Sequence, residues 1–289
     1  ADTMEVFAPV NLELRKMRQI VESEGGCIAW GGAVKLSPAD DILIRVERAL
    51  DIDSEGQMIA SVLSKKVAAG STHVVIDIPV GTTAKVRNFE AAQKLSRQLK
   101  TVGKAIGLTV QTIISDGSQP VGRGIGPALE ARDVISVLNN EKDAPDDLRE
   151  RALILAGSLL EMSGAVAAGK GRKTAQMILE NGDALHKFIA ICEAQGGFRE
   201  LTDTSLQQPV ISSKAGIVTS IDNRNLARVA KLAGAPRAKL AGVDFHTSLG
   251  SQIEIGQPLY TVHAETAGEL DYALGYVNSN GTAIRIEEG

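Results

Sequence analysis

Hydrophobic positions in the first part of the chain alternate between helical spacing and short, continuous apolar runs. Helical spacing predicts helices over residues 11–24, 57–69 and 86–106, each followed by glycine, which commonly ends a helix. The runs 73–80 and 108–114 are almost uninterrupted and rich in β-branched residues, as expected of parallel strands buried on both faces. Because each parallel pairing needs a crossover connection, this alternation predicts a mostly parallel sheet covered by helices.

The same reasoning predicts four more elements before residue 200. A short strand is expected at residues 27–30, ahead of a Gly-Gly turn, and helices are expected at 127–138, 147–168 and 174–194. The basic loop 169–173 would separate the last two helices. Its sequence lacks the Ser or Thr that follows the Lys of a Walker phosphate loop, so a solvated turn is the favoured interpretation.

Short runs of alternating hydrophobicity take over near Glu200. Residues 216–221 and 258–263 follow this pattern between Gly and Asn turns, and they predict strands. The amphipathic segment 224–233 predicts one helix in this tail. The tail is therefore expected to be α+β.

The change in pattern divides the chain into two predicted domains. Residues 1–205 form an α/β domain with a partial helical subdomain around residues 37–69, and residues 206–289 form the α+β domain. A length of 289 residues, of which 44% are hydrophobic, is sufficient for two cores. The chain begins Ala1-Asp2 rather than with Met, inside a structured pattern, so we expect the natural protein to extend further upstream.

The composition argues against several classes of function. A net charge of -4 argues against a basic surface for nucleic acid or for an anionic membrane. An aromatic content of 3% argues against side chains that stack on nucleic-acid bases. The sequence contains no apolar run long enough to span a bilayer and no signal peptide at its start. Cys27 and Cys192 fit no metal or redox motif, and the four histidines lack zinc-ligand spacing, so we expect no zinc and a cytoplasmic location.

Candidate chemistry is concentrated between residues 37 and 85. Ser61 and Lys65 are four residues apart on a predicted helix, so a hydroxyl and an ammonium project from the same face. The strand 73–80 follows and ends in a turn at Gly81, and ligands of open α/β sheets collect at such strand ends. The stretch predicts one wall of a pocket for a polar, planar ligand, although Ser61 and Lys65 taken alone are more typical of an exposed helix face.

Two further features have both a structural and a functional interpretation. Asp77, in the middle of the apolar strand, is either a hydrogen-bonded structural carboxylate or a site residue, and the structural interpretation is favoured. The loop 122–127 opens a helix and exposes amides, but its G-x-G-x-G spacing, well into the chain, does not match a dinucleotide-binding fingerprint. We favour a structural or ion-binding loop there.

Four motifs, taken in order, resemble a known family. They are Pro38-Ala39-Asp40-Asp41, residues 59–66 (Ile-Ala-Ser-Val-Leu-Ser-Lys-Lys), residues 77–81 (Asp-Ile-Pro-Val-Gly) and residues 119–122 (Gln-Pro-Val-Gly). They resemble the thymidine and pyrimidine-nucleoside phosphorylases and, more closely, the relatives that include AMP phosphorylase; the resemblance covers essentially the whole chain. In that family phosphate attacks the anomeric carbon of a nucleoside or nucleotide, and the products are a free base and a sugar 1-phosphate. The resemblance thus implies a pentosyltransferase with phosphate as co-substrate and no organic cofactor.

The resemblance also assigns residues to the base. Ser61 and Lys65 match the Ser and Lys of the Ala-Ser-x-x-x-Lys motif, which hold the edge of the base in the thymidine enzymes. An upstream arginine completes this contact in the family, and either Arg45 or Arg48 matches it here. Cationic donors near the departing base would lower the barrier, because the base gains negative charge as its bond to the sugar breaks.

The AMP-type relatives add a proton donor and a nucleotide contact, which match Asp53 and Lys85. As a general acid Asp53 would need a raised pKa, which a dry pocket supplies. The family also binds a structural cation near its Gly-rich loop. The matching positions are the carbonyls of Val121 and Gly124 and the carboxylate of Asp133, an oxygen-only set that suits a monovalent cation or calcium.

One departure from the family bears on activity. The phosphate-binding Lys-x-Ser-x-Gly-Gly segment of the family precedes the region where this sequence starts, and the motif occurs nowhere in the 289 residues. We therefore expect the chain alone to be inactive or nearly so, and the full-length protein to be a homo-oligomeric phosphorylase.

Three alternatives remain open. Within the family, the substrate is either a nucleoside, as in thymidine phosphorylase, or a nucleoside 5′-monophosphate, as in AMP phosphorylase. A transferase that uses phosphoribosyl pyrophosphate is weaker, because its acidic metal motif is not evident. The tail 212–265 resembles a barrel-sandwich domain of the biotinyl or lipoyl kind, but it lacks a Lys at an exposed hairpin tip, which argues against a non-enzymatic carrier module.

Overall fold

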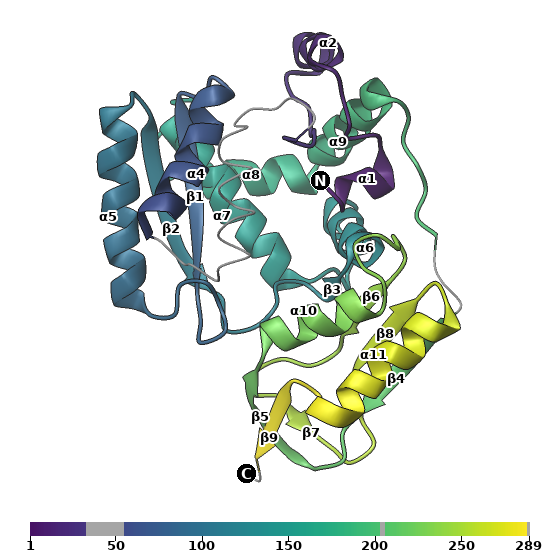
Figure 1. Cartoon of the computed structure of the whole chain (residues 1–289). Helices are drawn as coiled ribbons and strands as arrows, with labels where there is room; N and C mark the ends of the chain where they lie inside the picture. Colours follow the sequence, from purple (N-terminus) through teal and green to yellow (C-terminus); the bar gives the residue numbers. More distant parts are fainter. Residues whose placement is uncertain (33–54, 203–205, 288–289) are drawn as a thin grey trace.

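The computed structural model describes residues 1–32, 55–202 and 206–287 of the chain. They form a mixed α/β fold, which confirms the predicted class (Figure 1). Two parallel strands with covering helices occupy one end of the molecule, and two small antiparallel sheets with two helices occupy the other. The helices of the described part include none that is long and apolar enough to cross a membrane.

The parallel pair consists of β1 (His73–Val80) and β2 (Thr109–Asp116), in register from His73–Thr109 to Val80–Asp116. The crossover helix α5 (Phe89–Ala105) connects them, and α4 (Glu55–Ala68) packs against α5. Their shared core contains the buried residues Ile59, Leu63, Val74, Ile78, Ala92, Leu95, Leu99 and Leu108. The helices predicted at 57–69 and 86–106 and both strands are therefore confirmed; β1 has the predicted ends, and the ends of the other three elements are displaced by one to three residues.

The N-cap of α5 explains why the helix begins three residues later than predicted. Asn88 is the N-cap, and its side-chain oxygen accepts a hydrogen bond from the Ala91 amide at 2.8 Å. A helix begins where a side chain can satisfy its first free amides, and Val86 offers no such oxygen. Val86 instead forms a parallel bridge with Val80, beside the end of β1.

A second cluster joins the N-terminal segment to the middle of the chain. It involves the helices α1 (Met4–Phe7), α6 (Pro127–Leu138) and α9 (Asp183–Gln195), and α2 (Leu14–Glu24) packs against α9. Phe7 packs edge-on against Phe188 at 5.1 Å between ring centroids, and it stacks on Phe198 at 5.8 Å. These contacts anchor the N-terminal segment to the rest of the molecule.

The strand predicted at residues 27–30 is wrong. The Ile28 amide donates to the side-chain oxygen of Gln195 at 2.7 Å, and the Trp30 amide donates to the carbonyl of Val10. Gln195 also donates through Nε2 to the carbonyls of Pro9 and Ile28. A buried side chain of α9 therefore supplies the backbone partners that a neighbouring strand would otherwise provide.

The single helix predicted at 174–194 is also wrong, because α8 (Gly171–Glu180) ends before α9 begins. Gly182 adopts a φ of +86°, a left-handed conformation that breaks the helix. Before α8, α7 (Asp146–Met162) packs so closely on it that a Cβ added to Gly171 would lie 2.0 Å from the Gly157 carbonyl oxygen. Glycine is required at this crossing.

The C-terminal part contains two antiparallel sheets. One has the order β3 (Gly124–Ile125), β6 (Gly242–Phe245), β8 (Pro258–Ala264) and β4 (Leu206–Ile211). The other has the order β7 (Gln252–Ile253), β5 (Gly216–Ile221) and β9 (Ile284–Glu287). The strands predicted at 216–221 and 258–263 are confirmed. The small strand β3 comes from the Gly-rich loop, so a segment far upstream contributes to the first sheet.

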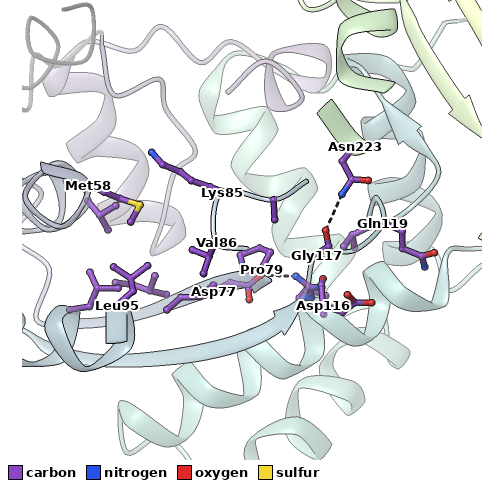
Figure 2. Close-up of a pocket in the computed structure, with 17 residues that line it drawn as sticks. Met58, Asp77, Pro79, Lys85, Val86, Leu95, Asp116, Gly117, Gln119 and Asn223 are labelled. Atoms are coloured by element: carbon purple, nitrogen blue, oxygen red, sulfur yellow. Dashed lines mark hydrogen bonds and ion pairs between the residues drawn. The ribbon is translucent and has the colours of Figure 1, made fainter. Parts of the chain in front are cut away.

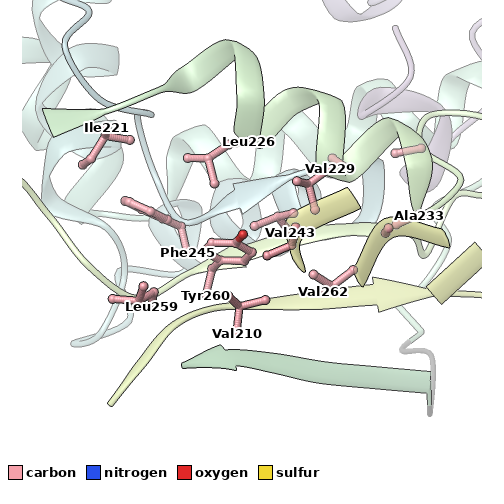
Figure 3. Close-up of a cluster of buried hydrophobic side chains, with 14 of the residues drawn as sticks. Val210, Ile221, Leu226, Val229, Ala233, Val243, Phe245, Leu259, Tyr260 and Val262 are labelled. Carbon is pink, nitrogen blue, oxygen red and sulfur yellow. The ribbon is translucent and has the colours of Figure 1, made fainter. Parts of the chain in front are cut away.

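Two helices complete this part: α10 (Asn223–Leu232), which confirms the helix predicted at 224–233, and α11 (Ala267–Asn280), which was not predicted. Figure 3 shows the core beneath α10. Leu226, Val243 and Tyr260 in this core are each 0% exposed. The expectation of one helix in the tail is therefore wrong. The predicted barrel-sandwich element and the boundary between residues 205 and 206 stay predictions.

Candidate active site

A cavity of about 420 Å³ lies beside the C-terminal ends of β1 and β2 (Figure 2). One part of its lining is apolar and consists of Met58, Val62, Ile76, Ile78, Val86, Leu95 and Leu99, with Pro79, Ala84 and Val121. The other part is polar and consists of Asp77, Lys85, Asp116, Gln119, Arg151 and Asn223, around Gly117. An apolar cavity with a few convergent polar groups at parallel strand ends is typical of a small-molecule site.

Asp77 lies where the polar part meets the sheet. Because side chains alternate along β1, Ile78 faces the core beneath α5 while Asp77 faces α7. The Asp77 carboxylate accepts hydrogen bonds from the Ser115 hydroxyl at 2.5 Å and from Arg151 Nη1 at 2.7 Å. Arg151 also donates through Nη2 to the Asp116 carbonyl at 2.7 Å, so it joins both strand ends. This fits the structural interpretation of Asp77, and both side chains also line the cavity.

The turns that follow the two strands touch through their backbones. A Cβ added to Gly81 would lie 2.4 Å from the Gly117 carbonyl oxygen, so both turns depend on the absence of a side chain at Gly81. The Gly81 amide donates to the Val86 carbonyl at 3.1 Å, and the Ala84 amide donates to the Gly81 carbonyl at 3.0 Å. These bonds fold the chain back on itself, and Lys85 is thereby placed at the cavity.

Asp116 is held as an anion at the rim. Hydrogen bonds from Ser118, supported by the positive charge of Arg151, lower the pKa of the Asp116 carboxyl below its ordinary value. The Ser118 amide lies 2.9 Å from Asp116 Oδ1. At neutral pH the polar part of the cavity therefore contains the anionic Asp116 beside the cations Lys85 and Arg151.

The structure brings together only part of the predicted base-binding set. Lys85 is exposed and lines the cavity, with its side chain drawn above the end of β1 in Figure 2. Ser61 and Lys65 are half-buried on α4, where Met58 and Val62 line the cavity and Ser61 and Lys65 do not. Ser61 follows Met58 by three positions, and Lys65 follows Val62 by three positions. Both therefore lie on the strip of the α4 surface next to the strip that lines the cavity.

The remaining members of that set lie outside the described residues. They are Asp53, the predicted proton donor, and the two candidate arginines, Arg45 and Arg48, together with the motif at residues 38–41.

The predicted cation ligands surround the start of α6. Asp133 is 4% exposed, and its Oδ2 accepts hydrogen bonds from the amides of Arg123 at 2.6 Å and Gly124 at 2.7 Å. Its Oδ1 lies 3.5 Å from Nε of Arg123. The carboxylate thus fixes the Gly-rich loop to α6, and a cation bound there would share Asp133 with a guanidinium.

The cation itself stays a prediction. In the described ranges no group of three or more His, Cys, Asp or Glu side chains could hold a metal ion. The predicted set of two carbonyls and one carboxylate is of a different kind, and its oxygen chemistry suits a hard cation.

Sequence reasoning missed several lining residues. Arg151 is one charge among several on α7, and Asn223 lies more than a hundred residues beyond β2. No local pattern connects either of them with the strand ends. For Asp116 and Gln119 a signal existed, because polar residues directly after a parallel strand face the usual ligand position.

A larger cavity of about 790 Å³ lies at the opposite end of β1. It is bounded by residues 70–73 and by α7 and α8, and its lining is mostly Ala, Leu, Ile and Val. Charged side chains are absent from its described lining. Of these two cavities the smaller is the stronger candidate site, because polar groups converge in it at the ends of parallel strands.

Comparisons with known proteins give a consistent result. Residues 217–283 match the family profile of the pyrimidine nucleoside phosphorylase C-terminal domain. The chain is 62% identical over 288 residues to "Putative thymidine phosphorylase 1" of an Acidovorax species and 63% identical to "Putative thymidine phosphorylase" of Legionella pneumophila (strain Corby). It is 58% identical to the protein of that name from Hahella chejuensis. Each match includes 100% of this chain, which spans 56% of the Acidovorax and Legionella proteins and 57% of the Hahella protein.

Proposed function

Because the chain belongs to the thymidine and pyrimidine-nucleoside phosphorylase family, we propose that the cavity at the ends of β1 and β2 holds the base of a nucleoside during phosphorolysis. In this reaction a phosphate oxygen bonds to the anomeric carbon as the bond from that carbon to the base nitrogen breaks. The base takes the bonding electrons and then a proton. The products are a free base and a sugar 1-phosphate.

The observation that carries the proposal is the mixed lining of the cavity. Its apolar part offers flat contact to the faces of a heterocycle, while Lys85, Arg151, Gln119 and Asn223 offer hydrogen bonds to its edge. A cation beside the leaving base stabilises the negative charge that develops on it. Ser61 and Lys65, on the next stripe of α4, complete the base contact in this proposal, with Asp53 as the proton donor and Arg45 as a further base contact.

The phosphate half of the site belongs to the same proposal. The sequence contains no Lys-x-Ser-x-Gly-Gly segment, and it spans about half the length of the relatives named above. Residues other than those of this sequence therefore supply the phosphate contacts, and the 289-residue chain alone is inactive.

A nucleoside 5′-monophosphate is the second candidate substrate. The position of Lys85 favours it, because the lysine that resemblance assigned to the nucleotide lines the cavity and is exposed. An exposed ammonium at the rim suits a phosphate that extends out of the pocket.

Four finer features complete the proposal. A monovalent or calcium ion binds the carbonyls of Val121 and Gly124 and the Asp133 carboxylate. The C-terminal sheets belong to a barrel-sandwich-like element, and the full-length protein is a cytoplasmic homo-oligomer.

A substrate panel tests the function. The full-length protein that contains this sequence is incubated with inorganic phosphate and, in turn, thymidine, uridine, AMP or CMP, and the released base is measured by chromatography. We expect release that requires phosphate, with the preferred substrate separating the two candidates. Release without phosphate, or no release from any of the four, would contradict the proposal.

A further inference from the structure

The C-terminal part touches the cavity through the first turn of α10. The Asn223 amide donates to the Thr83 hydroxyl at 3.3 Å, and the Asn223 side chain donates through Nδ2 to the Gly117 carbonyl at 3.0 Å (Figure 2). The next residue, Arg224, donates through Nε to the Thr83 carbonyl at 3.0 Å. One helix turn therefore binds the turn after β1 and the turn after β2 at once.

These contacts meet a requirement of the helix itself. The first amides of a helix have no partner within it, and each needs an acceptor. Asp222 caps the Asn225 amide at 3.0 Å, whereas the Asn223 amide finds its acceptor in Thr83, on the other side of the cavity mouth. The segment that leads to Lys85 thus supplies a hydrogen-bond acceptor for the N-terminus of α10.

The position of Lys85 depends on that segment. Lys85 follows Thr83 by two residues, and the bonds that the Gly81 and Ala84 amides make also restrain the backbone between β1 and Val86. A second link joins the same two parts of the molecule, because the Leu249 amide donates to the Gln119 side chain at 2.8 Å. The C-terminal part thereby fixes both strand-end turns around the cavity.

We infer that Asn223 and Thr83 form a latch that positions the 81–86 segment, and with it Lys85, at the mouth of the cavity. The inference rests on the proposed function for the claim that this cavity binds the nucleoside. Asn223 lines the cavity, whereas Thr83 does not, so the Thr83 end of the latch can be changed without altering the cavity lining. An effect of Thr83 on substrate binding has to act through the position of the segment.

The test uses the full-length protein with thymidine and inorganic phosphate. Thr83→Val removes the hydroxyl that accepts from the Asn223 amide, and we expect kcat/KM to fall about 3- to 10-fold, mainly through KM. Asn223→Ala keeps that backbone amide and removes only the side-chain bond to the Gly117 carbonyl, so it tests the contact with the turn after β2. Thr83→Ser keeps the hydroxyl and should restore the wild-type value. Asn225→Ala is the matched control on the same helix, since it removes the 2.7 Å bond from the Tyr276 hydroxyl and should leave KM unchanged.

Hydrogen exchange separates the latch from the function. The amides of Gly81 and Ala84 should exchange several-fold faster in Thr83→Val than in Asn225→Ala. If the wild-type protein releases no base from any of the four substrates of the panel, the proposed function fails and this exchange alone decides whether the latch exists. Unchanged exchange, an unchanged KM in Thr83→Val, or an equal rise of KM in Asn225→Ala would overturn the inference.

Discussion

The strand ends of the parallel pair and the core of the C-terminal sheets differ in whether their polar side chains are hydrogen-bonded. At the strand ends, the side chains of Asp77 and Arg151 are 22% and 18% exposed, and the Asp77 carboxylate accepts short hydrogen bonds from Ser115 and Arg151. In the C-terminal core Tyr260 is 0% exposed, and its hydroxyl has no hydrogen-bond partner among the described residues. Polar groups in the first region are held in fixed positions beside a cavity, whereas the second region is organised by apolar packing.

From this difference we expect that the residues that stabilise the fold and the residues that bind substrate lie mostly in different regions of the chain. Residues of the C-terminal core should affect folding strongly and substrate binding little, apart from those at the first turn of α10. Residues at the strand ends should affect folding less and the cavity more. The four predictions below test this separation, from the largest expected effect to the smallest.

Leu226→Ala should cause the largest loss of stability. Leu226 is 0% exposed beneath α10, and removing its side chain leaves a cavity in a packed core. We expect the free energy of unfolding, measured by urea denaturation, to fall by about 2–5 kcal/mol. The control is Leu159→Ala on α7, which is 45% exposed and should lose much less. Equal losses would show that the C-terminal core does not carry the stability assigned to it.

Asp77→Asn should have an intermediate effect on stability. The change removes the charge that pairs with Arg151 and leaves a mostly buried guanidinium without its carboxylate partner. We expect a loss of about 1–3 kcal/mol in urea denaturation. Glu150→Gln is the matched control, because it removes one negative charge from the exposed pair between Glu150 of α7, the helix that carries Arg151, and Arg172 of α8, and it should cost clearly less. An equal cost would mean that the Asp77–Arg151 contact has no special role.

Tyr260→Phe should leave stability unchanged or raise it by up to about 1 kcal/mol. Burial of the Tyr260 hydroxyl raises its pKa, and a buried hydroxyl without a partner is itself a cost that Phe removes. The melting temperature of the variant measures this directly. A clear loss of stability would reveal a partner for the hydroxyl and weaken the contrast between the two regions.

Asp116→Asn should have the smallest effect on stability, and this effect should depend on pH. The folded pKa of Asp116 is below its unfolded value, so the carboxylate stabilises the fold above the unfolded pKa of about 3.9, and this stabilisation is lost as pH falls through the folded pKa. The variant should therefore be less stable than wild type near neutral pH, with the difference shrinking at lower pH. Urea denaturation at a series of pH values checks this, and a difference that grows on acidification would contradict it.

Patterns of short range explain what the sequence predicts well. The continuous β-branched run fixes β1 at His73–Val80, and glycines end α2 and α4. The missed helix α11 had one local signal, a capping box in which Thr266 and Glu269 bond to each other. The helix was not predicted, because the segment contains two glycines and its hydrophobic residues show only weak helical spacing.

Contacts of long range explain what the sequence does not predict. The segment 27–30 has strand composition, yet its backbone partners are the buried Gln195 and Val10. The cavity likewise depends on Arg151 and Asn223, which α7 and α10 bring from distant parts of the chain. Spacing along the chain gives no information on such pairs. Lys85 was assigned by the family resemblance; it lines the cavity, and its role as a nucleotide contact stays a prediction.

The most direct test is a crystal structure of the full-length protein with thymidine and phosphate bound. The proposed function predicts that the base lies within about 4 Å of Met58 or Val62 and that Lys85 faces its edge. A nucleoside bound instead in the apolar cavity between β1, α7 and α8, or anywhere else away from the strand ends, would contradict it.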